Sequence, residues 1–139
     1  MLSKGLISTI MAMTIFPIKD LNYLGQLKWK NRVLIIINND NINIDKTIAK
    51  YESDFLDRDF ILIQIKNNKA YVNNELMPDS FTRSVIKKIK KNNSGDNVIL
   101  IGKDGKVKKS YKSIMEIDKI FLDVDKMPMR KKELKNLIK

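Results

Sequence analysis

The sequence predicts a single three-layer α/β domain, in which a central mixed sheet of about four or five strands is flanked by helices. Its 139 residues are enough for one ordinary domain. A hydrophobic fraction of 43% allows the chain to bury enough apolar surface to offset its ordering entropy. Continuous β-branched runs, typical of strands buried on both faces, alternate with segments of helical apolar spacing.

The first half of the chain predicts a β–α–β unit. Residues 32–40 (RVLIIINND) form a β-branched run that ends in turn formers, and residues 59–65 (DFILIQI) form a second such run. The apolar residues between them recur along one helical face, namely Ile44, Ile48, Tyr51 and Phe55. Asn41 or Asn43 is suited to cap this helix. A right-handed crossover between parallel strands is therefore expected.

The middle of the chain predicts a second helix and a third strand. Residues 69–79 (KAYVNNELMPD) resemble a short strand or an irregular excursion. A helix is then expected to start at Asp79 or Ser80 and to end at the turn formers NNSGDN. Residues 97–103 (NVILIGK) follow as the third strand.

The last third predicts a hairpin and a closing helix. Asp104-Gly105 is a strong type I′ turn signal, and residues 106–111 (KVKKSY) carry the lysines of a protected edge strand. Ser113 and Glu116 predict a capping box that opens the helix. The resulting order, β–α–β–(excursion)–α–β–β–α, is that of a thioredoxin-like domain.

Composition excludes several kinds of chemistry. The chain contains no cysteine and no histidine. Thiol nucleophiles, disulfide exchange, thiolate metal sites and imidazole acid–base catalysis are therefore excluded. Any catalysis would have to use carboxylates, lysine, hydroxyls or an oxygen-liganded metal, and the sequence predicts no cofactor.

The net charge of +11 is concentrated in the second half. Residues 1–82 carry ten Lys/Arg against nine Asp/Glu, whereas residues 83–139 carry seventeen against seven. Such a basic half could attract nucleic acid, anionic lipid or an acidic partner. The abundance of lysine, isoleucine and asparagine is also what an A/T-rich genome produces, and no aromatic residue lies within the lysine-rich KKIKK. Nucleic acid is therefore not the favoured partner.

Residues 1–18 predict a signal peptide or an N-terminal anchor, ahead of a domain over residues 21–139. Lys4 precedes an uncharged, mostly apolar run over residues 6–18. This run is shorter than the about twenty residues of a membrane span, but it matches the hydrophobic region of a secretory signal. The alternative is a buried N-terminal segment of the domain. The expected location is periplasmic or secreted, otherwise cytoplasmic, and the expected partner is a protein of the cell envelope.

Four segments resemble one bacterial family: residues 29–37 (WKNRVLIII), 57–60 (DRDF), 100–108 (LIGKDGKVK) and 125–134 (DKMPMRKKEL). That family is a domain of unknown function with a thioredoxin-like, peroxiredoxin-related fold. Related domains occur in extracellular animal proteins, including sushi-repeat-containing ones. The resemblance implies export, and it brings no activity or cofactor. The residues that it makes candidates for a structural or binding cluster are Arg32, Arg58, Asp59, Gly102, Lys103, Asp104, Gly105, Asp125, Met127, Pro128, Met129, Arg130 and Glu133.

One departure from thioredoxin-like redox enzymes concerns the start of the first helix. In those enzymes a reactive cysteine lies just after the first strand, where the helix N-terminus stabilises its thiolate. Here residues 38–43 read NNDNIN. Asn39, Asp40 and Asn41 are candidates for an anion or ligand site at this helix end, and the alternative is that these residues only cap the helix.

The D-x-M-P-M-R-x-x-E segment predicts a structural clasp. Arg130 and Glu133 are three residues apart on a helix, and Asp125 and Glu133 are both candidates to receive the Arg130 guanidinium. Arg32 and the Arg58–Asp59 pair could join them, because strand ends of one sheet converge. A ligand site is the alternative reading of the same residues.

The same segment predicts a junction between two helices. Pro128 should end one helix near residues 125–127 and begin the next. Met127 and Met129 are expected to fill gaps at this junction.

Two further patterns do not indicate a functional site. Gly102-Lys103-Asp104-Gly105 lacks the spacing of a phosphate-binding loop and is read as a hairpin turn. Asp123 and Asp125, two apart on a helix, face different directions and form a poor metal-ligand pair.

Three functional classes remain open. The leading one is a non-redox binding or accessory module of the cell envelope. The second is a carboxylate- or metal-dependent enzyme that uses Asp40, Asp125, Arg130 and Glu133. The third is a nucleic-acid-binding protein that uses the basic half.

Overall fold

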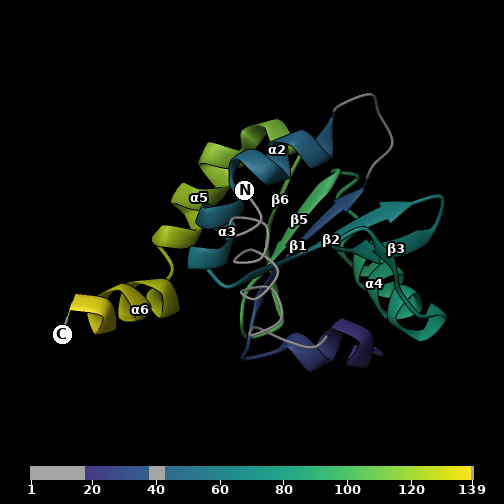
Figure 1. Ribbon diagram of the computed structural model, residues 1–139, viewed down its shortest axis with the longest axis horizontal. Coiled ribbons are helices and arrows are strands. Elements are labelled where there is room, and N and C mark those ends of the chain that lie inside the picture. Colours follow the sequence, from purple (N-terminus) through teal and green to yellow (C-terminus); the bar gives the residue numbers. More distant parts are fainter. Residues whose placement is uncertain (1–17, 38–42, 139) are drawn as a thin grey trace, which may run out of the picture.

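The computed structural model describes residues 18–37 and 43–138 as one α/β domain with a mixed six-stranded sheet between two layers of helices (Figure 1). The strands are β1 (Arg32–Ile37), β2 (Phe60–Lys66), β3 (Lys69–Val72), β4 (Glu75–Leu76), β5 (Val98–Ile101) and β6 (Val107–Tyr111). The helices are α2 (Ile44–Lys50), α3 (Glu52–Asp57), α4 (Asp79–Asn92), α5 (Ile117–Asp125) and α6 (Pro128–Ile138), with 3₁₀ turns η1 (Ile18–Asp20), η2 (Leu24–Leu27) and η3 (Ile114–Glu116). No helix in the described ranges is long and apolar enough to cross a membrane.

The sheet has the strand order β4-β3-β2-β1-β5-β6. β1 and β2 are parallel, with Arg32 opposite Phe60 and Ile37 opposite Ile65. The β1–β5, β5–β6, β2–β3 and β3–β4 pairs are antiparallel. The predicted β–α–β unit is therefore confirmed, and β6 is an edge strand as its lysines predicted.

The sheet has one or two strands more than predicted, because the excursion at residues 69–79 forms β3 and β4. Two asparagine pairs, Asn67-Asn68 and Asn73-Asn74, make the tight turns on either side of β3. Their φ angles are +51°, +62°, +52° and +64°. Such positive values at both central positions define the turn that suits a two-residue hairpin, and asparagine tolerates them better than most residues.

The two central strands place alternate side chains in two separate cores. Val33 and Ile35 belong to the core that η2 and α4 cover, whereas Leu34 and Ile36 belong to the core under α2, α3 and α5. Figure 1 shows α4 on the opposite side of the sheet from these three helices. All four side chains are at most 2% exposed. This double burial explains why β1 is a continuous apolar run without alternation.

The first predicted helix is divided into α2 and α3 at Tyr51. Asn43 caps α2 as one of the two expected cap residues, and its side-chain oxygen accepts a hydrogen bond from the Lys46 backbone N–H at 3.1 Å. Beyond the break, Phe55 contacts Phe60 and Phe121 edge-to-face at centroid distances of 5.6 and 5.1 Å. The apolar stripe thus stays on one face across the break.

The β5–β6 hairpin is confirmed, but the predicted type I′ turn is wrong. Only Gly105 has a positive φ, +80°, whereas a type I′ turn also needs one at Asp104. The Gly102 N–H donates to the Lys106 carbonyl at 3.0 Å, so the loop spans five residues and a register irregularity follows it. A side chain at Gly102 would meet Lys108, because an added Cβ would lie 2.5 Å from Lys108 Cε.

The start of the last core helix is shifted from the predicted capping box. The Ser113 hydroxyl accepts from the Met115 N–H at 3.1 Å, as a cap should. The Glu116 carboxylate accepts from the Lys112 N–H at 3.0 Å instead of from Ser113. The first turn is consequently the 3₁₀ turn η3, and α5 begins only at Ile117.

The N-terminal part of the described chain belongs to the domain. Leu21 and Leu27 are at most 1% exposed and lie in the core beside α4. The apolar run that predicts a signal peptide falls almost entirely in residues 1–17, outside the described residues. Export therefore stays a prediction.

Candidate functional site

Eight charged side chains gather at the end of the sheet where the parallel strands begin. We call them the ionic cluster: Arg32, Asp57, Arg58, Asp59, Lys103, Asp125, Arg130 and Glu133. Arg32 is the first residue of β1, Asp59 precedes β2, and Lys103 follows β5. The remaining members come from the ends of α3 and α5 and from α6. The cluster unites the four sequence segments that carry the family resemblance.

Arg32 and Glu133 form the buried centre of the cluster. The two guanidinium nitrogens Nη1 and Nη2 of Arg32 donate to Oε1 and Oε2 of Glu133, each at 3.1 Å. Arg32 is only 1% exposed, so this bidentate pair neutralises a charge that water cannot reach. Lys103 Nζ bridges Glu133 Oε2 and Asp59 Oδ2 at 2.7 Å each. Strand β1, the β5–β6 loop and α6 are thereby tied together.

Arg130 is buried as well, with 3% of its side chain exposed, and it has three acidic neighbours. Its Nη2 donates to Asp57 Oδ2 at 2.6 Å, and its Nη1 donates to the Asp57 carbonyl at 3.0 Å. Its Nε donates to Asp125 Oδ1 at 3.2 Å, whereas Glu133 Oε1 lies 3.6 Å from Nη1. Asp125 and Glu133 were the expected partners, but Asp57 is the nearest and was missed.

Arg58 completes the clasp on the side of α5. Its Nε and Nη2 donate to the two carboxylate oxygens of Asp125 at 3.0 and 2.8 Å. Its guanidinium carbon lies 4.5 Å from the centre of the Phe121 ring, within the range of a cation–π interaction. Asp125 therefore receives two arginines at once, Arg58 and Arg130.

The carboxylates of the cluster are held in their ionised form. Burial alone would raise the pKa of Asp125, but hydrogen bonds from Arg58 and Arg130 outweigh it and hold that pKa below its usual value. Burial likewise opposes ionisation of Glu133, and Arg32 and Lys103 together lower its pKa. Burial disfavours the charged Arg130, yet Asp57 and Asp125 raise its pKa. Neither carboxyl is thus suited to donate a proton near neutral pH.

The remaining predicted residues of the GKDG and MPM segments shape the surroundings of the cluster. The Asp104 carboxylate accepts from Lys108 Nζ at 2.7 Å and from the Lys106 N–H at 3.0 Å, outside the cluster. Pro128 opens α6, and Met127 packs against the core under α5, both as expected. Met129 was expected to fill a gap but is 40% exposed, because it lies on the outer face of α6.

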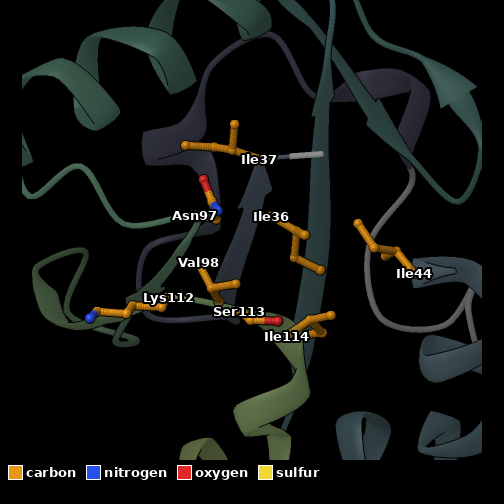
Figure 2. A pocket seen from close by; sticks show the side chains of 8 residues that line it. All are labelled: Ile36, Ile37, Ile44, Asn97, Val98, Lys112, Ser113 and Ile114. Atoms are coloured by element: carbon orange, nitrogen blue, oxygen red, sulfur yellow. The ribbon is translucent and has the colours of Figure 1, made fainter. Parts of the chain in front are cut away.

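The other candidate site, which comprises Asn39, Asp40 and Asn41, lies outside the described residues. Figure 2 shows a small cavity beside the carboxyl end of β1, around which Ile36, Val98 and Ile114 gather while Lys112 points away. Its volume of about 10 Å³ is no larger than a single water requires. No ligand site is assigned to this cavity.

The acidic residues of α5 have separate partners. Asp123 accepts from the Tyr111 hydroxyl at 2.6 Å and lies 3.3 Å from Lys109 Nζ, whereas Asp125 faces the arginines. Burial and this hydrogen bond to Asp123 raise the pKa of Tyr111. Among the described residues, no three carboxylates come together in a way that could hold a metal ion.

Comparison with known proteins identifies the family. Residues 23–133 match the model of the family described as Domain of unknown function (DUF4174), so the chain belongs to that family. Neither a curated protein nor a solved structure matches the chain.

We expect Arg130→Lys to lower the free energy of unfolding by about 2 kcal/mol, because one ammonium cannot replace a buried guanidinium that donates in three directions. Urea denaturation followed by circular dichroism measures this change. The matched control is Arg83→Lys, at an exposed site on α4, which should stay within about 0.5 kcal/mol of the parent. An Arg130→Lys protein as stable as the control would contradict the clasp.

Stability should also fall on acidification. The folded-state pKa values of Asp125 and Glu133 are depressed, so their contribution is present above the unfolded-state values of about 4 and is lost as the pH falls through the folded-state values. The free energy of unfolding should therefore decrease from about pH 5 downward. Glu133→Gln should be less stable at pH 7 and show a shallower decrease, whereas Glu75→Gln, at an exposed site on β4, should keep the parental slope. Equal slopes in all three proteins would refute this role of Glu133.

Proposed function

Starting from membership of a family of unknown function, we propose that this domain is a non-redox, thioredoxin-like binding or accessory module that contacts a protein partner in the cell envelope. The observation that carries the proposal is the pairing of charges in the ionic cluster. Each of its buried cations is matched by acidic side chains within the cluster, as expected of a structural clasp. A catalytic site would instead leave a group free to react.

The strand order supports a thioredoxin-like core. In the β2-β1-β5-β6 part of the sheet, β1 and β2 are parallel, and β5 and β6 form an antiparallel hairpin. Helices α2, α3 and α5 cover one face and α4 covers the other. This is the arrangement that the predicted element order implies for a thioredoxin-like domain. β3 and β4 extend it at the β2 edge.

The location of the ionic cluster argues against a catalytic role for its residues. In open α/β sheets, ligands bind outside the carboxyl ends of the strands. The cluster lies at the opposite end, where β1 and β2 begin. Of the four residues of the enzyme alternative, Asp125, Arg130 and Glu133 therefore lie at this end of the sheet and are engaged with one another, whereas Asp40 lies outside the described residues.

The proposed envelope location rests on the N-terminal sequence. Residues 1–18 combine Lys4 with an uncharged, mostly apolar run over residues 6–18, and the family resemblance implies export. An exported domain is separated from the nucleic acid of the cytoplasm, so the excess of lysine is assigned to composition or to an acidic partner.

Purified protein should catalyse neither insulin reduction by dithiothreitol nor peroxide consumption above the buffer rate. The physical reason is the absence of cysteine and histidine from the whole chain. Thioredoxin and a peroxiredoxin serve as positive controls. A rate that increases in proportion to the concentration of this protein would end the non-redox proposal.

Residues 1–30 fused to an alkaline phosphatase that folds only after export should yield phosphatase activity in cells. The apolar run would direct the fusion through the membrane. The control fusion carries Ile10→Lys, which interrupts that run and should abolish activity. An intact, inactive fusion that stays in the cytosol would contradict the envelope location and make RNA binding the next assay.

A further inference from the structure

A groove of about 400 Å³ lies on the side of the sheet opposite α5. It is bounded by η2, by α4 and by the loop between β5 and β6. Its volume falls within the about 300–1,000 Å³ typical of small-molecule sites. None of the residues that line it belongs to the ionic cluster, so the groove is a separate feature of the domain.

The floor of the groove is apolar. Leu24, Leu27, Val33 and Ile101 contribute to its lining, and each is at most 9% exposed. They belong to the core that continues under α4, so the floor is fixed by packing. A ligand with an apolar body would cover this surface and displace water from it.

Asn31 adds a polar group that lacks a partner. It lines the groove and is only 1% exposed. Its Nδ2 donates to the Asp59 carbonyl at 3.1 Å, which fixes the orientation of the amide. Its Oδ1 is buried and accepts no hydrogen bond from any described residue. An orphaned acceptor of this kind is unfavourable in the unliganded domain, and a ligand N–H or O–H would satisfy it once a rotation of the side chain opens the enclosed oxygen to the groove.

The rim of the groove is positively charged. Lys28, Lys88 and Lys106 line it, and Lys88 is half-buried on α4. The one acidic residue of the lining, Asp104, forms an ion pair with Lys108 at 2.7 Å. Lys88 has no ion-pair partner within residues 18–37 and 43–138. The excess of positive charge at the rim therefore attracts an anionic group.

We propose that this groove binds a small organic acid that combines an apolar body, one anionic group and one hydrogen-bond donor. The apolar body lies on the floor of the groove, and the hydrogen-bond donor reaches Asn31 Oδ1. The anionic group faces Lys28, Lys88 and Lys106. The inference rests on the proposed binding role and adds to it a site and a ligand class. No reaction of the bound acid is proposed.

N-Benzoyl-L-leucine is a suitable probe, because it has an apolar body, a carboxylate and an amide N–H. Titration of the ¹⁵N-labelled full chain should shift the backbone NMR signals of η2, of the start of β1, of α4 near Lys88 and of the β5–β6 loop. Lys88→Ala should weaken binding about fivefold, since a partly exposed charge pair is lost. The matched control Lys87→Ala removes the same charge from an exposed site one residue away and should bind as the parent does.

Two altered probes test the carboxylate and the amide donor separately, without changing the protein. N-Benzoyl-L-leucinamide lacks the carboxylate, and N-benzoyl-N-methyl-L-leucine lacks the donor. Each should bind at least about threefold more weakly than the parent probe, because each loses one polar contact. Equal binding of all three probes would overturn the proposed ligand class.

The outcomes separate this inference from the proposed function. The groove site would be overturned if no NMR signal changed up to the solubility limit of the probe, or if the changes were confined to the carboxyl end of β1 and the start of α2. Either result would leave the non-redox role standing. Redox turnover by the pure protein would overturn that role, whatever the groove binds. Equal weakening by Lys88→Ala and Lys87→Ala would also count against the groove, because it would show that only the overall charge attracts the probe.

Discussion

The structure depends on the pairing of two buried guanidinium groups, Arg32 and Arg130. A guanidinium that is at most 3% exposed is tolerated only when carboxylates and carbonyl oxygens replace its water. Glu133 meets this requirement for Arg32, and Asp57 with Asp125 meets it for Arg130. Because Glu133 belongs to α6, this helix is held against the sheet by charge, while Leu134 and Leu137 along it remain exposed.

The clasp also determines where binding can occur. At the end of the sheet where the parallel strands begin, the buried charges are already paired with one another. An added ligand there would have to displace a bidentate ion pair and leave a buried charge, which is costly. The groove beside η2 differs, since it combines an apolar floor, a half-buried lysine and an unused acceptor. The charges of the ionic cluster are paired with one another, whereas the groove has a lysine and an acceptor without partners among the described residues. Binding is therefore favoured in the groove.

The sequence predicts those features of the fold that depend on local pattern. The runs at β1, β2 and β5 are mostly apolar on both faces, so their place in the middle of a covered sheet follows directly. The turns at Asn67-Asn68 and Asn73-Asn74 were missed, because asparagine without glycine is a weaker signal for positive φ. Asp57 was missed for another reason. In sequence it resembles the nearby Asp54, and only the docking of α6 selects it as the partner of Arg130.

The clasp and the groove share one short segment of chain. Asn31 lines the groove and donates to the Asp59 carbonyl, while the Asp59 carboxylate binds Lys103 in the cluster. The next residue, Arg32, donates its backbone N–H to that same Asp59 carbonyl. Asp59 has a φ of +55°, a strained value that these contacts hold in place. A ligand that satisfies Asn31 would therefore stabilise the backbone on which the clasp is built, so binding in the groove and stability of the fold are linked.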